Sequence, residues 1–162
     1  IKNVQEKQTI AQLAAMLINE DEVIYLDAGS TTLEMIPFLQ DKKVTIVTNS
    51  VKHAAKLVDL QLPTIILGGQ VKISTNAVLG SNTIDQLKNF HFNKAFMGMN
   101  GADLNHGFTT PDPEEAAIKR LAMANAEESF VLIELSLSPV NCARVLLPSM
   151  SRLSMSCWRR KS

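Results

Sequence analysis

The ten residues VIYLDAGSTT, at positions 23–32, decide the fold class of this chain. They begin with four apolar residues and end in small polar residues that suit a tight turn followed by the start of a helix. A short strand that is apolar on both faces is typical of a parallel sheet covered by helices on each side. The sequence therefore predicts a buried strand over 23–26 and a helix over 31–39.

The same alternation of strand and helix recurs along the chain. Further strands are predicted at 44–48, 64–67, 94–99 and 130–134, and further helices at 3–19, 50–58, 81–88 and 114–126. No sequence period of 20–50 residues repeats, and no low-complexity linker divides the chain. We therefore expect one α/β domain of three layers, with a Rossmann-like parallel sheet in the middle.

Composition narrows the function classes. The 162 residues carry 16 Lys and Arg against 16 Asp and Glu, and this zero net charge argues against a nucleic-acid binder driven by electrostatics. No stretch reaches the ~20 apolar residues of a membrane span, and no signal peptide is recognisable, so we expect a soluble, cytoplasmic protein. The spacing of the cysteines and histidines predicts neither a disulfide framework nor a metal site, and no cofactor is expected.

The charge is distributed unevenly. Residues 135–162 contain five basic residues, seven serines and no acid, whereas all 16 acidic residues lie in 1–134. A basic interaction tail is one explanation, and an altered reading frame is the other. We expect a domain over 1–134 and an atypical tail over 135–162. The chain also begins with Ile1 and runs directly into a helix, which predicts that a further module precedes it.

The turn that follows the first predicted strand is suited to an anion. Gly29 lets the backbone approach a ligand, and Ser30, Thr31 and Thr32 stand where a helix begins, next to Asp27. Free N–H groups and the positive end of the helix dipole attract negative charge there. The alternative is that Ser30 or Thr31 only caps the helix.

Other predicted strands end in similar groups, and in a parallel sheet the carboxyl ends of the strands meet at one edge. The second strand ends in Thr48, Asn49 and Ser50, Gly68 and Gly69 follow the third, and Asn100, Gly101 and Asp103 follow the fourth. Singly, these residues are common caps and turns. Together they predict a crevice for a small, polar, anionic ligand.

Glu115 and Lys119 are four residues apart on the helix predicted at 114–126, so they share a face. They form either a solvated surface pair or a second part of the site. In the site, Lys119 would reach a phosphate and Glu115 would meet sugar hydroxyls.

Five motifs occur in the order and spacing of a known family over about residues 5–134. The motifs are DAGSTT at 27–32, VTNS at 47–50, LGG at 67–69, AFMGMNG at 95–101 and TTPDPEEA at 109–116. They resemble the effector domain of DeoR-family transcriptional regulators, with the fructose-operon repressors closest and the lactose-type phosphotransferase repressors next. After Ile133 the family's Asp-Ser-Ser-Lys-Phe-like turn is replaced by ELSLS at 134–138.

This resemblance implies the fold of ribose-5-phosphate isomerase, glucosamine-6-phosphate deaminase and the CoA-transferases. It implies a phosphorylated sugar as effector, plausibly fructose 1-phosphate, and operator DNA bound by a winged helix-turn-helix that would precede Ile1. A homo-oligomer is also expected. Carried over by position, the ligand loops are residues 29–32, 48–50, 68–69 and 100–103, with Glu115 and Lys119 at the edge.

Two other functions remain open from the sequence. A sugar-phosphate isomerase or deaminase would need a general base and an acid over the sugar, and Asp27, Asp103 and Glu115 are the available carboxylates. None of them lies in a motif typical of catalysis in those enzymes. A dimerisation module with an unused pocket is the third possibility. We expect a sensor and no catalytic residues.

Overall fold

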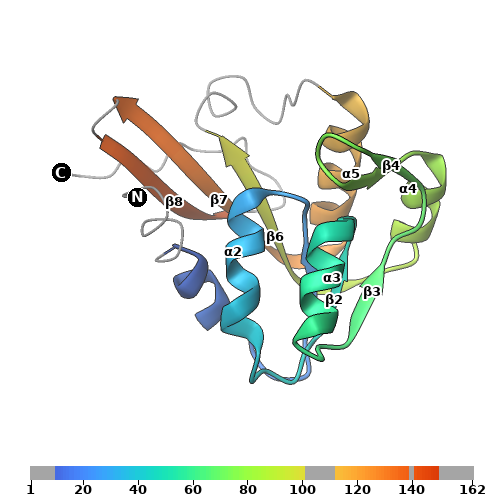
Figure 1. Cartoon of the computed structure of the whole chain (residues 1–162), viewed down its shortest axis with the longest axis horizontal. Coiled ribbons are helices and arrows are strands. Elements are labelled where there is room, and N and C mark those ends of the chain that lie inside the picture. The colour runs from blue at the N-terminus through green and yellow to red at the C-terminus, as the bar shows by residue number, and fades with distance from the viewer. Residues whose placement is uncertain (1–9, 101–111, 139–140, 150–162) are drawn as a thin grey trace.

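One six-stranded sheet organises the computed structural model, which describes residues 10–100, 112–138 and 141–149 (Figure 1). The strand order is β3-β2-β1-β6-β7-β8, and the first five strands run parallel while β8 runs antiparallel to β7. The strands are β1 (Val23–Leu26), β2 (Thr45–Thr48), β3 (Thr64–Ile66), β6 (Phe92–Asn100), β7 (Ala126–Ser138) and β8 (Asn141–Ser149). The predicted parallel α/β sheet is confirmed.

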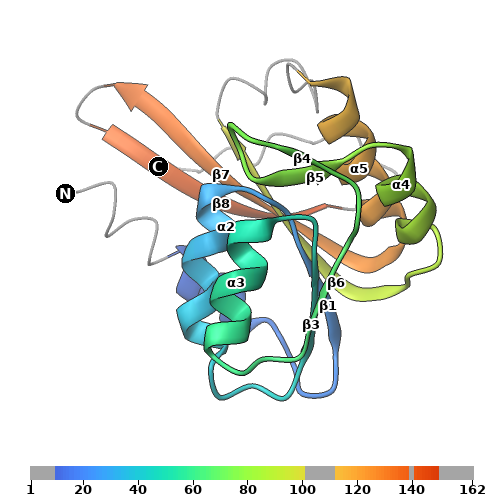
Figure 2. The same ribbon diagram turned by 45° about the vertical axis from the view of Figure 1, so that its right-hand side comes forward.

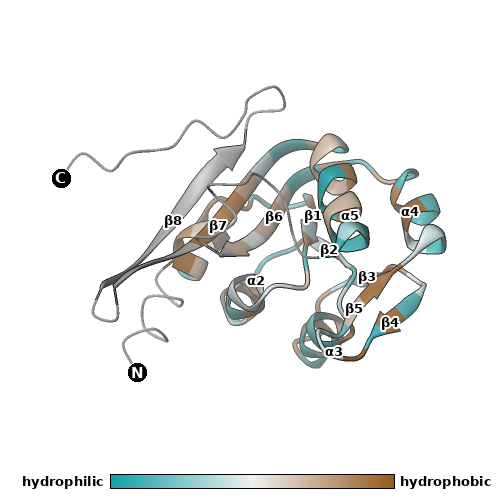
Figure 3. Cartoon of the chain, turned by 90° about the horizontal axis from the view of Figure 1, so that it is seen from above, coloured by the Kyte–Doolittle hydropathy of each residue, from teal (hydrophilic) through white to brown (hydrophobic). Residues whose placement is uncertain are grey.

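Helices cover both faces of this sheet, as seen from above in Figure 3. A helix over 10–16 packs on one face with α2 (Ser30–Met35), η1 (Ile36–Leu39) and α3 (Val51–Asp59), whereas α4 (Ser81–Leu87) and α5 (Pro113–Ala124) pack on the other. No helix in the described part of the chain is long and apolar enough to span a membrane.

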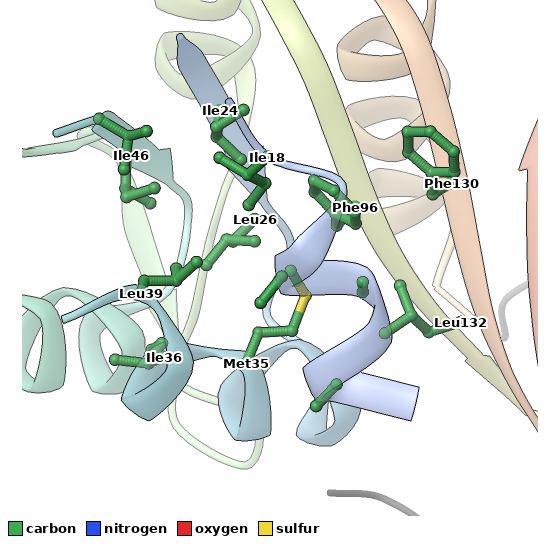
Figure 4. Close-up of a cluster of buried hydrophobic side chains, with 14 of the residues drawn as sticks. Ile18, Ile24, Leu26, Met35, Ile36, Leu39, Ile46, Phe96, Phe130 and Leu132 are labelled. Atoms are coloured by element: carbon green, nitrogen blue, oxygen red, sulfur yellow. The ribbon is translucent and has the colours of Figure 1, made fainter. Parts of the chain in front are cut away.

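The core follows from the alternation of side chains along β1. Ile24 and Leu26 point into one apolar cluster with Met35 and Phe96, which Figure 4 shows, whereas Tyr25 points into the second cluster beneath α5. Successive side chains of a strand face opposite sides of a sheet, so a strand that is covered on both faces is apolar throughout. This is the physical reason that the apolar run predicted the strand.

The helix predicted over 31–39 changes character near its end. Residues 36–39 form the 3-10 helix η1, and Pro37 lies in its first turn. Proline lacks the N–H that would continue an α-helix, and its ring conflicts with the carbonyl four residues earlier, so the helix tightens there. The helix predicted over 3–19 is described over 10–16, and the residues before Ile10 lie outside the described part.

Three strands were not predicted. The short antiparallel hairpin of β4 (Gln70–Lys72) and β5 (Ala77–Leu79) lies beside α5 (Figure 2). The third is β8, and β7 continues to Ser138, so the composition boundary after residue 134 lies inside a strand. The altered-frame interpretation of the tail remains a prediction.

Candidate functional site

A cavity of about 130 Å³ lies beyond the carboxyl ends of β1 and β2, beneath the β4–β5 hairpin and beside α5. The neighbouring parallel strands place the ends of β1 and β2 side by side, with Leu26 opposite Thr48. Loops and helix starts converge at such an edge, which makes it the usual ligand site of open α/β sheets. The lining residues are Tyr25, Asp27, Ala28, Gly29, Asn49, Thr75, Ala77, Glu115 and Lys119.

Asp27 is the buried carboxylate at the centre of this edge. One of its oxygens accepts the N–H of Gly29 at 3.0 Å and the hydroxyl of Thr32 at 2.9 Å. The other oxygen accepts the N–H of Gly98 at 2.8 Å and lies 3.3 Å from the Lys119 ammonium. Four donors therefore surround one carboxylate, which is how proteins accommodate a buried charge.

Gly29 brings the β1–α2 turn against β6. A Cβ on Gly29 would lie 3.1 Å from a carboxylate oxygen of Asp27 and 3.3 Å from Cα of Gly98. These distances are shorter than ordinary contacts of a Cβ atom. The predicted close approach at Gly29 is therefore to the protein's own backbone as well as to the cavity, which Gly29 lines.

The start of α2 leaves backbone donors available. Gly29 is the N-cap residue, and no side chain caps the helix, so neither Ser30 nor Thr31 has the capping role that was the alternative. The first backbone bond of the helix runs from the N–H of Leu33 to the carbonyl of Gly29. The N–H groups of residues 30–32 have no acceptor among the described residues, as expected for a first turn.

The second predicted loop is tied together internally. The Thr48 hydroxyl accepts the N–H of Ser50, and Ser50 is the N-cap of α3, where it accepts the N–H of His53. Asn49 faces the cavity, and its side-chain oxygen Oδ1 accepts the Tyr25 hydroxyl at 2.9 Å. In this loop, Asn49 lines the cavity. Ser50 caps helix α3, which was the alternative to ligand binding.

His53 connects the first two loops, a role that was not predicted from the sequence. Its Nδ1 lies 2.7 Å from the Ser50 hydroxyl, and its Nε2 lies 3.0 Å from the carbonyl of Gly29. Because that carbonyl can only accept, Nε2 carries the proton and Nδ1 accepts from Ser50. Burial lowers the pKa of His53 below its usual value, while the Asp27 charge opposes this shift, so the neutral ring is favoured.

The third predicted loop lies against α4 and does not line the cavity. The Gly68 carbonyl accepts the Thr83 hydroxyl at 2.8 Å, and the Gly68 N–H donates to the side chain of Gln86 at 2.9 Å. Gly69 has a φ of +156°, and a Cβ there would overlap the Thr83 hydroxyl. In the described structure, the bonds of Gly68 and the close approach at Gly69 hold the end of β3 against α4.

Glu115 and Lys119 both reach the cavity from α5, but they do not pair with each other in the described structure. Lys119 donates to the Gly98 carbonyl at 2.9 Å and faces Asp27, and Glu115 lies 3.7 Å from the Lys72 ammonium of β4. Glu115 and Lys119 therefore do not form the solvated i, i+4 pair that was the alternative. Lys72 also bonds Asp112 at 3.0 Å, and this bond lowers the pKa of the Asp112 carboxyl.

The fourth predicted loop is described only at its start. Asn100 is the last residue of β6, and nothing is described of its side chain. Gly101 and Asp103 lie outside the described residues.

Sequence reasoning missed several residues of the site. Tyr25 was assigned only to a strand, and Thr75 and Ala77 belong to a hairpin that was not predicted. Burial raises the pKa of the Tyr25 hydroxyl well above its usual value, and the Asp27 charge adds to this effect, so the group stays protonated and donates. The polar tip of Tyr25, the one tyrosine in the chain, next to a turn rich in hydroxyls was the signal available in the sequence.

The chain is similar to known transcriptional regulators. It is 42% identical over 134 residues to the uncharacterized HTH-type transcriptional regulator FruR of Bacillus subtilis (strain 168), covering 82% of this chain and 53% of that protein. It is 32% identical over 136 residues to the lactose phosphotransferase system repressor of Lactococcus lactis subsp. lactis, again covering 82% and 53%. The chain thus spans about half the length of the curated relatives it matches.

Solved structures share the fold at lower identity. Ribose 5-phosphate isomerase A of Methanocaldococcus jannaschii superposes with a TM-score of 0.53 at 18% identity, covering 82% of this chain and 55% of the enzyme. A D-ribose-5-phosphate isomerase in complex with phospho-erythronic acid gives a TM-score of 0.55 at 18% identity, covering 81% and 53%. The expected isomerase-type fold is confirmed.

The model of the DeoR C terminal sensor domain matches residues 2–138, which include all the described strands except β8. The five family motifs lie within this match, and three of them contribute residues that line the cavity: Asp27, Ala28 and Gly29 from the first, Asn49 from the second and Glu115 from the last. This chain therefore belongs to the family of DeoR C-terminal sensor domains.

Proposed function

We propose that this domain binds a phosphorylated sugar and so controls a winged helix-turn-helix that represses a sugar-utilisation operon in the cytoplasm. The observation that carries the proposal is the turn at 29–32, where three backbone N–H groups without an acceptor among the described residues directly follow Gly29, which lines the cavity. Unpaired N–H groups at a helix start suit a phosphate. The isomerase that shares this fold with bound phospho-erythronic acid supports a phosphorylated ligand.

The proposed site has two parts. The turn formed by Gly29, Ser30, Thr31 and Thr32 holds the phosphate, and the cavity takes the sugar. Asp27 holds the turn in place, while Asn49, Glu115 and Lys119 present polar groups to the cavity. Thr48, Ser50, Gly68 and Gly69 belong to the neighbouring loops of the site, which Asn100, Gly101 and Asp103 complete in this proposal.

A ligand regulates DNA binding only if it favours one of two states of the protein. A coupling free energy of ~1–3 kcal/mol between effector and DNA is typical of such regulators. Fructose 1-phosphate is the first effector to test, because the chain resembles fructose-operon repressors and FruR is among its relatives. We also propose that the domain forms a homo-oligomer, which light scattering in solution would measure.

Catalysis is the competing proposal, since the fold is shared with isomerases. An isomerase needs a carboxylate that is free to take a proton from the sugar. Both oxygens of Asp27, the buried carboxylate of the cavity, are occupied by donors. We therefore propose no catalytic role, and a coupled isomerase assay that showed turnover above background would overturn this choice.

Calorimetric titration of the chain tests the ligand class. Fructose 1-phosphate, fructose 6-phosphate and glucose 6-phosphate are compared with the parent sugars and with inorganic phosphate. We expect one phosphosugar to bind and its parent sugar not to bind. At a ligand concentration ~100 times the Kd, the domain gains about 2.7 kcal/mol of stability, which is seen as a rise in Tm.

One variant removes a single backbone donor from the proposed phosphate turn. Ser30 is the first residue of α2, and Gly29 before it has φ −77° and ψ 157°, a conformation that suits the residue before a proline. Ser30→Pro therefore keeps the helix start and deletes one N–H. We expect about tenfold weaker phosphosugar binding than in Ser30→Ala, which keeps the N–H, because bonds to charged groups contribute ~1.5–3 kcal/mol. Equal affinities of the two variants would contradict the anion turn.

The regulatory part needs a chain in which this domain is joined to the DNA-binding module. We expect the phosphosugar that binds the domain to lower the affinity of that chain for operator DNA. Saturation of the domain with no change in operator affinity would contradict the sensor.

A further inference from the structure

The turn of the β4–β5 hairpin is held in a fixed place beside the cavity. Val78 donates its N–H to the Asn49 carbonyl at 2.6 Å, and Val51 donates its N–H to the Asn76 carbonyl at 3.0 Å. The Asn49 side chain adds a third bond, from its amide to the Val78 carbonyl. The hairpin is therefore tied to the loop that follows β2, and its residue Thr75 lines the cavity.

Glu115 of α5 faces this turn from the other side of the cavity. The Thr75 hydroxyl oxygen accepts the N–H of Ala77 at 3.4 Å and lies 3.4 Å from a carboxylate oxygen of Glu115. The Lys72 ammonium, 3.7 Å from the same carboxylate oxygen, holds the Glu115 side chain toward the hairpin. The β4–β5 hairpin thus presents a hydroxyl, and α5 presents a carboxylate that faces it. Both residues line the cavity.

The bond between these two groups is long, so a third group beside them can bond to both. A hydroxyl that donates to a carboxylate normally lies ~2.5–2.7 Å from it, so 3.4 Å is a weak contact. A ligand hydroxyl can donate to Glu115 and accept from Thr75, which gives both groups shorter bonds than they have with each other.

The charges of the cavity favour an uncharged hydroxyl at this position. Its described lining carries two carboxylates, Asp27 and Glu115, and one ammonium, Lys119, which Asp27 already faces. A phosphate placed against Glu115 would meet a like charge, whereas the hydroxyl of a sugar meets an acceptor. The phosphate and the sugar are thereby directed to different parts of the site.

We propose that Thr75, acting with Glu115, is a specificity-determining residue that recognises one hydroxyl of the sugar. This proposal rests on the proposed sugar-phosphate function. It means that the β4–β5 hairpin chooses among phosphosugars that share the same phosphate contacts.

The test compares Thr75→Val, which has nearly the same shape without the hydroxyl, with Thr75→Ser, which restores the hydroxyl. Thr64→Val is the matched control, because Thr64 starts β3 and bonds the Leu62 carbonyl away from the cavity. Calorimetry gives the Kd of each chain for fructose 1-phosphate, fructose 6-phosphate, glucose 6-phosphate and inorganic phosphate. Thermal unfolding gives the Tm of each variant.

We expect Thr75→Val to weaken the phosphosugar that binds best by about tenfold or more, as the loss of a bond to a ligand hydroxyl held by a charged group predicts. Thr75→Ser and Thr64→Val should stay within about threefold of the unchanged chain, and the affinity for inorganic phosphate should not change in any variant. The ratio of affinities between phosphosugars should fall in Thr75→Val.

Two results would overturn this inference. One is an unchanged phosphosugar affinity in Thr75→Val, and the other is an equal loss of affinity for phosphosugar and inorganic phosphate. If the unchanged chain bound none of the phosphosugars, the proposed function itself would fail, and the inference with it. Failure of the function is thus seen in the unchanged chain, and failure of the inference alone is seen only in the variant.

Discussion

The carboxylate of Asp27 accepts the backbone N–H of Gly98 at 2.8 Å, across 71 positions of the sequence. Its other oxygen accepts the N–H of Gly29, so a single side chain joins the turn after β1 to the strand β6. The fold of this edge therefore depends on one buried charge.

Asp27→Asn should destabilise the domain. An amide has one oxygen in place of two, so its NH₂ group must face donors that now have no acceptor, and Lys119 loses its counter-charge. We expect a loss of ~3 kcal/mol in the free energy of unfolding, measured by urea denaturation. Asp59→Asn, at the exposed end of α3, is the control and should change stability by less than ~0.5 kcal/mol. Similar values for the two variants would contradict the role of Asp27.

Two glycines with positive φ differ in what a Cβ atom would meet. Comparing substitutions at the two positions therefore distinguishes steric conflict from backbone strain. Gly69 has φ +156° with a side chain and a carbonyl where a Cβ would be, whereas Gly80 has φ +111° with nothing within 4 Å. Replacing Gly80 with Ala should cost about 1 kcal/mol of strain. The same change at Gly69 should cost about 3 kcal/mol or more, because atoms must also move. Calorimetric unfolding of both variants measures the difference, and equal values would argue against the packing at Gly69.

Stability should fall at acid pH because of His53. Burial lowers its pKa in the folded state, so between that pKa and the unfolded value near 6.5 the unfolded chain binds more protons. The contribution of His53 is therefore complete above pH ~6.5 and is lost as the pH falls toward the folded pKa, with a slope of at most about 1.4 kcal/mol per pH unit.

His53→Gln should remove most of this slope between pH 5 and 7, as urea unfolding at several pH values would show. The exposed His91 provides the matched control variant, His91→Gln. An identical pH profile in the His53 variant and the unchanged chain would show that other groups are responsible. The groups that face His53 electrostatically are Asp27, Lys52 and Lys56.

A buried ion pair at the opposite edge of the sheet should affect stability alone. Lys94 of β6 contacts both carboxylate oxygens of Glu22, at 2.8 and 2.6 Å, and the two side chains are only 8% and 14% exposed. Lys94→Met leaves a buried charge and should cost ~3 kcal/mol, whereas adding Glu22→Gln should recover at least ~1 kcal/mol. Phosphosugar affinity should stay the same in both variants. A double variant less stable than Lys94→Met would contradict this account.

The sequence was sufficient for the strands that are covered on both faces. Residues 23–26 and 45–48 are apolar or small throughout, and a run of this kind has few alternatives next to helical periodicity. The strands β4 and β5 have three residues each, and the residues of β4 are largely exposed, so neither gave a usable pattern. The hairpin depends on bonds to the loop after β2, which sequence periodicity does not contain.

The loops that line the site could be predicted from the sequence, but the hydrogen bonds between these loops could not. Gly29 and Asn49 were expected because the ends of parallel strands meet, and both line the cavity. His53 lies between a lysine and an alanine on a helix, and nothing in that pattern shows that its ring reaches the carbonyl of Gly29. Such a contact exists only after two helices have packed on the same face of the sheet.

The position of β1 in the sheet has a consequence for folding. Its neighbours are β2, which follows directly, and β6, which returns after some 65 residues of intervening chain. The cavity draws Gly29 and Asn49 from the earlier segment and Glu115 and Lys119 from the later one. Because the cavity takes its lining from both segments, it is complete only after the slow, long-range pairing of β1 with β6. An effector that fills the cavity will therefore resist the separation of these halves, so its binding will slow the unfolding of the whole domain.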